Sequence, residues 1–292
     1  MREAVIVSSV RTAVGRAGRG TLRQTRPDDM AAEAIRGALA RVSAVKPEMV
    51  EDVVLGCAMP EAEQGMNVAR IASLLAGVPP TAAAMTVNRF CASGLQAIAL
   101  AVDAVRSGRV DVAVAGGTES MSLIPMGGHK VAPNPTLLER YPDSYLGMGM
   151  TAELVAKKYG IDRERSDAFA LQSHRKALAA IEAGRFKDET VPLTVTVPPD
   201  DGGQPHTVTF DVDEGPRRDT DATALAKLKP AFSARGIVTA GNASQMSDGA
   251  SVCVVMSRKF RRAVASQTRR KSANAIVFGN FGARPRPPWR LS

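Results

Sequence analysis

One cysteine of this chain lies in a context where cysteines are reactive. Cys91 follows an extended, partly β-branched segment at residues 83–87 and precedes residues 93–105, a run of small side chains with helical spacing. A cysteine at that junction lies at a helix N-terminus, where unpaired backbone N–H groups and the positive end of the helix dipole favour the thiolate. Because a thiolate attacks carbonyl carbon, we predict that Cys91 is a nucleophile that accepts an acyl group.

The other two cysteines, Cys57 and Cys253, lie in strand-like contexts, and we expect inert buried thiols there. The spacing of the three cysteines matches neither a disulfide framework nor a metal site. The first residues indicate a strand and not a secretory signal, and no apolar run approaches the ~20 residues of a membrane span. We therefore expect a cytoplasmic protein with no metal and no membrane partner.

The net charge of +9 is concentrated at the C-terminal end. Residues 258–292 contain ten Lys or Arg and no Asp or Glu, so subtraction from the totals of 38 and 29 leaves 28 basic and 29 acidic side chains in residues 1–257. A body of net charge −1 does not indicate a nucleic acid as partner. For the tail we expect no regular structure, and an out-of-frame or truncated end explains its composition better than a basic arm.

Strand and helix patterns alternate over residues 1–119. The apolar strands are expected at residues 4–10, 50–56, 83–87 and 111–115, and the helices at residues 28–42, 66–76 and 93–105. This alternation is typical of an α/β domain whose largely parallel sheet is covered on both faces.

The composition changes at residue 120, and we interpret residues 120–235 as an inserted loop subdomain. It comprises a Gly-, Pro- and Met-rich segment, two helices and a β-hairpin, expected at residues 121–150, 151–159, 163–183 and 191–212. Residues 236–257 return to the strand character of the first domain.

Several motifs resemble one enzyme family. The segment Val-Asn-Arg-Phe-Cys-Ala-Ser-Gly at residues 87–94 is similar to the acylation site of thiolases, the acetyl-CoA acyltransferases. Further segments resemble the same family in the same order, and they lie at residues 11–15, 116–122, 184–189, 239–244 and 247–250. Together these matches cover residues 1–257.

The resemblance implies the α/β thiolase fold, in which two similar layered halves pack together and the first half carries an inserted loop domain. It implies no metal and no tightly held cofactor, with acyl-CoA and CoA as partners and a homodimer or homotetramer as the assembly. Cys91 would take the acyl group as a thioester, and CoA or a second acyl-CoA would resolve it.

The resemblance also implies residues that contact coenzyme A. Arg217 would lie near the adenine or the phosphates, and a guanidinium complements phosphate. Phe232, Ala240 and Ser244 would lie along the pantetheine arm, and Met148 would line the acyl pocket.

Other features bear on substrate and activity. Gly147 stands where thiolases for acetoacetyl-CoA often carry His, which favours the broader, degradative 3-ketoacyl-CoA type. The histidines, His129, His174 and His206, are not in the family's Gly-His-Pro context, and we expect surface residues. The family's Cys-x-Gly-Gly-Gly segment is also absent from these 292 residues.

These absences lead us to expect that the second half of the fold is largely missing. A chain without the histidine and the second cysteine is expected to acylate slowly at Cys91 and not to turn over. The main hypothesis is a thiolase-type acyltransferase. The alternatives are a catalytically dead fragment that retains a CoA-binding or dimerisation surface, a ketoacyl synthase and, least favoured, a nucleic-acid-binding protein.

Overall fold

The computed structural model describes residues 1–199, 203–267 and 276–277. These residues form two compact units. Unit 1 comprises Met1–Thr12, Thr25–Ser120 and the chain from Gly249 onward, and unit 2 comprises Ala13–Gln24 and Met121–Asp248. The domain boundaries expected from the sequence stay a prediction.

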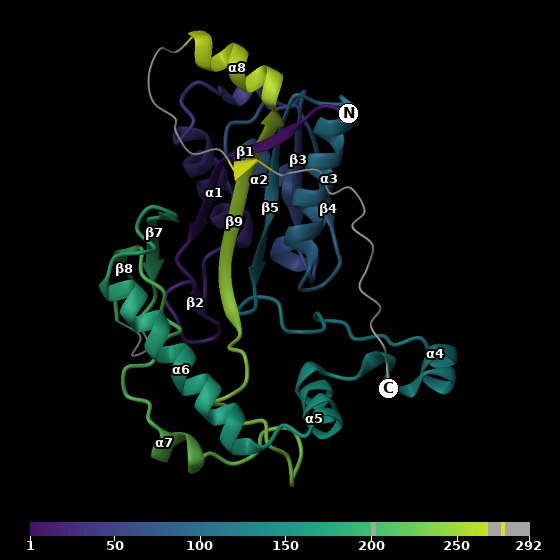
Figure 1. Ribbon diagram of the computed structural model, residues 1–292, viewed down its shortest axis with the longest axis vertical. Helices are drawn as coiled ribbons and strands as arrows, with labels where there is room; N and C mark the ends of the chain where they lie inside the picture. The colour runs from purple at the N-terminus through teal and green to yellow at the C-terminus, as the bar shows by residue number, and fades with distance from the viewer. Residues whose placement is uncertain (200–202, 268–275, 278–292) are drawn as a thin grey trace. The chain divides into compact units, whose positions relative to one another are not determined.

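Unit 1 is built on one mixed sheet (Figure 1). Its strands lie in the order β10 (Ile276–Val277), β1 (Ala4–Thr12), β9 (Ser247–Ser257), β5 (Val112–Ser120), β3 (Asp52–Gly56) and β4 (Ala83–Val87). β3 pairs in parallel with both β4 and β5, as the alternation of strands and helices predicts. β1 and β9 pair antiparallel, so this side of the sheet departs from the parallel arrangement that the sequence led us to expect.

Three helices of unit 1 follow from local signals. α1 (Pro27–Ala40) begins with proline and has two aspartates in its first turn, which suit the positive end of the helix dipole. The N-cap of α2 (Val68–Leu75) is Asn67, whose side chain accepts a hydrogen bond from Arg70 N at 3.2 Å. α3 (Ser93–Ser107) ends at Gly108, which has a φ of 80°.

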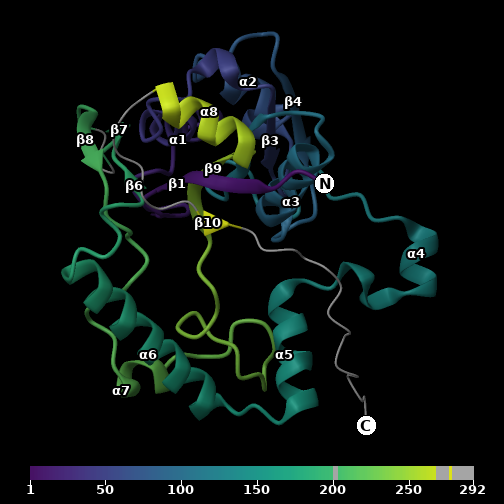
Figure 2. The ribbon, with the colours of Figure 1, turned by 45° about the horizontal axis from the view of Figure 1, so that its top comes forward.

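These helices cover both faces of the sheet. α3 packs on β3 and β5, where Ala101, Ala104 and Val105 meet Ala113 and Ala115 in a core of small side chains. α1 and α2 contact one another and lie on the other side of the sheet from α3 (Figure 2). Because alternate residues of β5 point to opposite faces and all of residues 112–116 are buried, this strand is covered on both sides.

The basic tail differs from the expectation where the structure describes it. Arg258–Gln267 form a helix, α8, although we expected no regular structure in this segment. An ion pair of 2.5 Å between Arg258 and Glu3 of the same unit lies at its start. Residues 268–275 and 278–292, the remainder of the expected tail apart from β10, lie outside the described residues.

The regular structure of unit 2 is mainly helical, and loops join its elements. Its helices are α4 (Pro135–Arg140), α5 (Met148–Tyr159), α6 (Arg163–Glu182) and α7 (Ala222–Ala226). Its short strands are β2 (Gly15–Arg16), β6 (Thr190–Val191), β7 (Leu193–Val197) and β8 (His206–Phe210), and β7 and β8 form the predicted hairpin. The brief 3₁₀ turns of the chain are η1 (Pro47–Met49), η2 (Ala62–Gln64) and η3 (Pro142–Tyr145). Helices α4 and α7 were not predicted, because they are too short to show a periodic pattern.

Two acidic residues explain why residues 13–24 belong to unit 2. Asp213 accepts a hydrogen bond from Val14 N at 2.8 Å. Glu214 accepts from Arg16 N and Thr21 N, each at 2.9 Å. Among the described helices, none is long and apolar enough to cross a membrane.

Candidate active site

Cys91 lies in a sharp turn between β4 and α3. The strand ends at Val87, the helix begins at Ser93, and Cys91 directly precedes the helix N-cap, Ala92. Phe90 has a φ of 47°, in the left-handed region that costs a bulky residue about 1–2 kcal/mol. Cys91 is exposed, and its thiol makes no hydrogen bond to any residue that the structure describes. The turn therefore presents a free thiol close to the start of α3.

Two polar side chains determine the shape of this turn. Asn88 Oδ1 accepts a hydrogen bond from Phe90 N at 2.8 Å, and Asn88 Nδ2 donates one to Ala58 O at 2.9 Å. Ser93 Oγ accepts from Arg89 N at 2.8 Å and donates to Phe90 O at 2.5 Å. The backbone around Phe90 is therefore bonded to the side chains of Asn88 and Ser93. Neither role was predicted from the sequence.

Glycines allow α3 to approach the sheet directly below this turn. A Cβ atom on Gly56, at the end of β3, would lie 2.4 Å from the carbonyl carbon of Ser93 and 2.5 Å from Gly94 N. Both contacts are with backbone, which cannot move aside. Gly56 therefore fixes how closely the first turn of α3 lies on β3.

The other two thiols are shielded. Cys57 and Cys253 are 1% and 2% exposed. Burial, together with the nearby negative charge of Glu119, raises the pKa of Cys57 from 9.0 to about 12, and burial alone raises the pKa of Cys253 to about 12. Both thiols stay protonated at neutral pH, as expected for inert buried cysteines.

A carboxylate organises the loop that follows β3. Glu119, near the end of β5, accepts hydrogen bonds from Ala58 N at 2.6 Å, Met59 N at 3.2 Å and Gln64 Nε2 at 2.5 Å. Gln64 is fully buried and also donates to Met59 O at 2.9 Å. The same loop carries the Ala58 carbonyl that receives the bond from Asn88, so this network reaches the turn before α3.

The five expected coenzyme A contacts all lie in unit 2, whereas Cys91 lies in unit 1. Met148 is the first residue of α5 and is 58% exposed. Phe232 is 49% exposed, and its ring lies so close to Gly149 that a Cβ atom there would be 2.3 Å away. The structure thus brings Phe232 against the first turn of α5, next to Met148.

Ala240 and Ser244 are exposed residues of one loop, and two carboxylates hold the start of this loop. Glu153 of α5 accepts hydrogen bonds from Ile237 N at 3.0 Å and Val238 N at 2.9 Å. Asp167 of α6 forms the second anchor, through Asn242. Glu153 thus bonds to backbone groups that lie 84 and 85 residues further along the chain. No local sequence pattern could predict these bonds.

Asp167 lies at the centre of a charged network. It is 8% exposed, accepts from Arg163 Nε at 2.7 Å and accepts from Asn242 Nδ2 at 2.8 Å. Asn242 Oδ1 accepts in turn from Thr239 N at 2.7 Å. Arg163 also donates to the carbonyl of Leu225 at 2.6 Å, which links α7 to the same centre.

Arg217 is exposed and bonded to its neighbours. Its guanidinium pairs with Asp219 at 2.9 Å, and this hydrogen bond lowers the pKa of the Asp219 carboxyl. The backbone N–H of Arg217 donates to His174 Nδ1 at 3.2 Å. His174 is thus half-buried and bonded, in contrast to the surface position that we expected, whereas His129 and His206 are exposed.

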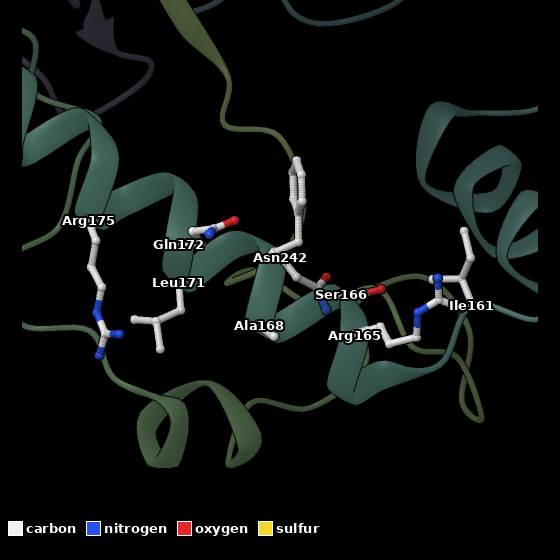
Figure 3. A pocket seen from close by; sticks show the side chains of 9 residues that line it. Ile161, Arg165, Ser166, Ala168, Leu171, Gln172, Arg175 and Asn242 are labelled. Carbon is white, nitrogen blue, oxygen red and sulfur yellow. The ribbon is translucent and has the colours of Figure 1, made fainter.

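A groove runs along α6 from Ile161 to Arg175 (Figure 3). Phe169 and Gln172 lie between these ends, and Asn242 lines it from the neighbouring loop. None of the five expected coenzyme A contacts lines this groove.

Comparison with known proteins shows what kind of protein carries this site. A family profile described as the N-terminal domain of thiolase matches residues 4–259. The 3-ketoacyl-CoA thiolase of Bacillus subtilis (strain 168) is 50% identical over 293 aligned residues, which cover 99% of this chain and 73% of that protein. The 3-ketoacyl-CoA thiolase of Stutzerimonas stutzeri (strain A1501) is 44% identical, covering 88% of this chain and 64% of that protein.

A solved structure agrees with these relatives. The crystal structure of the Bacillus anthracis acetyl-CoA acetyltransferase superposes with a TM-score of 0.78 at 38% identity, covering 91% of this chain and 68% of that chain. The fold is that of an acyltransferase. The chain belongs to the thiolase family. Thiolases use coenzyme A thioesters as substrates and need no metal or other cofactor.

Proposed function

We propose that Cys91 is the nucleophile that carries the acyl group. The observation that supports this role is the exposed thiol beside the N-cap of α3, in a turn shaped by Asn88 and Ser93. The positive end of the α3 dipole can stabilise both the thiolate and the oxyanion that forms when it attacks a thioester. The N–H groups of Ala92 and Ser93 donate within the turn, to Arg89 O at 3.1 Å and to Phe90 O at 2.9 Å.

The substrate that we propose is a 3-ketoacyl-CoA, which is the substrate named for the relatives. Cys91 Sγ attacks the 3-keto carbon, the bond between carbons 2 and 3 breaks, and the acyl group remains on sulfur. The departing acetyl-CoA carbanion takes up one proton, which balances the proton that the thiol has lost. In the full reaction the thiolate of free CoA then attacks the acyl-enzyme, releases a shortened acyl-CoA and regenerates the Cys91 thiolate. For these 292 residues, we expect slow acylation without this turnover.

For the binding of coenzyme A we propose Met148, Phe232, Ala240, Ser244 and Arg217. Contact between Phe232 and Gly149 supports a shared role for the first two, and the loop that carries Ala240 and Ser244 is anchored by two helices. Arg217 would have to exchange its bond to Asp219 for a phosphate oxygen, which is feasible because this pair is exposed.

We also propose a wider setting for this activity. The enzyme would act in fatty-acid degradation by β-oxidation. It would work in the cytoplasm, as a homodimer or homotetramer. Support comes from the relatives named 3-ketoacyl-CoA thiolase. Sedimentation analysis of the purified chain tests the assembly.

The test of the nucleophile is acylation of the chain itself. We expect incubation with acetyl-CoA to add one acetyl group, located at Cys91 by peptide mass spectrometry. Cys91→Ala should remove this adduct, whereas Cys253→Ala, at a buried thiol, should retain it. An adduct that persists in Cys91→Ala would refute the assignment.

A further inference from the structure

The turn before α3 contains strain that something must hold in place. Phe90, an aromatic residue, has a φ of 47°, whereas the left-handed region is normally left to glycine. Such strain persists only where the surrounding structure over-determines it. Phe90 is 64% exposed, so burial of its own side chain is not what confines it.

Asn88 is well placed to confine Phe90. Its Oδ1 accepts from Phe90 N at 2.8 Å, two residues further along the chain, which is the geometry of an Asx turn. Its Nδ2 donates to Ala58 O at 2.9 Å, in the loop that Glu119 holds by two backbone N–H groups. One amide therefore joins the strained turn to a loop that is itself fixed to β5.

We propose that Asn88 is a positioning residue for the acyl transfer. The hydrogen bonds of its side chain are to Phe90 N and Ala58 O, and it acts by keeping Phe90 left-handed, so that Cys91 stays beside the N-terminus of α3. This inference rests on the proposed role of Cys91. Displacement of a reacting group by about 1 Å can cost on the order of 10²-fold in rate, so loss of the two hydrogen bonds of Asn88 is expected to have a large effect even though Ser93 also bonds to this turn.

The first experiment compares two asparagines of unit 1. Asn67 also bonds backbone with both ends of its amide, accepting from Arg70 N at 3.2 Å and donating to Ala84 O at 3.1 Å. We expect Asn88→Ala to slow acetylation of Cys91 by acetyl-CoA about 10- to 100-fold. Asn67→Ala should slow it less than about threefold although it lowers the melting temperature at least as much, because Asn67 caps α2.

The second experiment removes the strain itself. Glycine adopts a positive φ without the steric cost that Phe90 bears, so Phe90→Gly in the Asn88→Ala background should recover most of the lost acetylation rate. A residue that only stabilises the fold would show no such rescue, because the second substitution adds no contact. Phe90→Gly alone serves as the reference.

The outcomes separate the two proposals. Equal loss of acetylation in Asn88→Ala and Asn67→Ala, in proportion to stability, would overturn the role of Asn88, as would the absence of rescue by Phe90→Gly. If the unaltered chain is not acetylated at Cys91, the proposed nucleophile fails. The role of Asn88 is then read from alkylation of Cys91 by iodoacetamide, which needs no coenzyme A, and an unchanged alkylation rate in Asn88→Ala would overturn it.

Discussion

The three cysteines of this chain differ in the surroundings that the fold gives to each sulfur. Cys91 is exposed beside a helix start, whereas Cys57 and Cys253 are buried, with pKa values raised to about 12. A buried thiol that cannot ionise at neutral pH is a poor nucleophile. At the scale of single residues, burial distinguishes the two shielded thiols from the exposed thiol of Cys91.

The buried thiols make stability depend on alkaline pH. Their pKa in the unfolded chain is near 9.0 and in the folded chain about 12, so the folded state binds more protons between these values. The free energy of unfolding should therefore be unaffected by these groups below about pH 9 and should fall as pH rises from 9 towards 12. Urea titrations at several pH values measure this slope.

The matching control removes one buried thiol at a time. Cys57→Ala or Cys253→Ala should make the alkaline slope shallower. An unchanged slope in both buried variants would show that other groups cause the loss.

At the scale of elements, the position of Cys91 depends on how closely α3 lies on the sheet. Gly56 permits this approach because a side chain there would overlap the backbone of Ser93 and Gly94. Gly94 has more room, since its added Cβ atom would lie 3.8 Å from Gly116 O, an ordinary contact distance.

The two glycines therefore form a matched pair. We expect Gly56→Ala to destabilise the fold by about 1–3 kcal/mol, because overpacked backbone must shift. Gly94→Ala should change stability by less than about 1 kcal/mol, because alanine favours helix and finds space. Chemical denaturation of both variants measures the difference, and equal losses would contradict it.

The same reasoning applies to the loop of unit 2 that we propose for coenzyme A. Asp167→Asn should cost about 2–3 kcal/mol, because Arg163 and Asn242 lose a charged, buried acceptor. It should also weaken the binding of CoA, measured by calorimetry, because the loop from Thr239 to Ser244 loses its anchor on α6.

Asp143→Asn is the control for this change. Asp143 is exposed, so the same loss of charge should leave stability within about 0.5 kcal/mol of the unaltered chain. Loss of CoA binding in both variants would indicate a general charge effect, and the anchor role of Asp167 would be wrong.

At the scale of the whole molecule, charge is distributed very unevenly. Residues 1–257 are almost neutral, and ten cationic side chains follow them. A near-neutral thiolase body gives no reason for binding polyanions, whereas a cluster of cations does so without sequence preference.

Removal of residues 268–292, which hold six of the ten cations, should therefore lower the salt concentration at which the chain elutes from heparin. Acetylation of Cys91 should stay within about twofold, because no proposed site residue lies in that segment. Unchanged elution would place the polyanion affinity in residues 1–267.

Much of unit 1 was predictable from sequence because its signals are local. The strand at residues 83–87 and the helix that begins at Ser93 appear where the pattern of β-branched and small side chains puts them. The motif around Cys91 identified the thiolase family, which the comparisons confirmed. The helix from Arg258 was not predicted because its strongly basic composition indicated an irregular tail, although Phe260 and Ala263 recur at helical spacing.

The sequence alone thus determined the fold class, the family and the candidate nucleophile, because each is encoded in short runs of neighbouring residues. Only the tertiary structure revealed the bond from Asn88 to Ala58, the anchors at Glu153 and Asp167 and the contact of His174 with Arg217. These interactions join residues 30 to 85 positions apart. Hydrogen bonds between such distant segments depend on how the elements pack, and they leave no periodic pattern in the sequence.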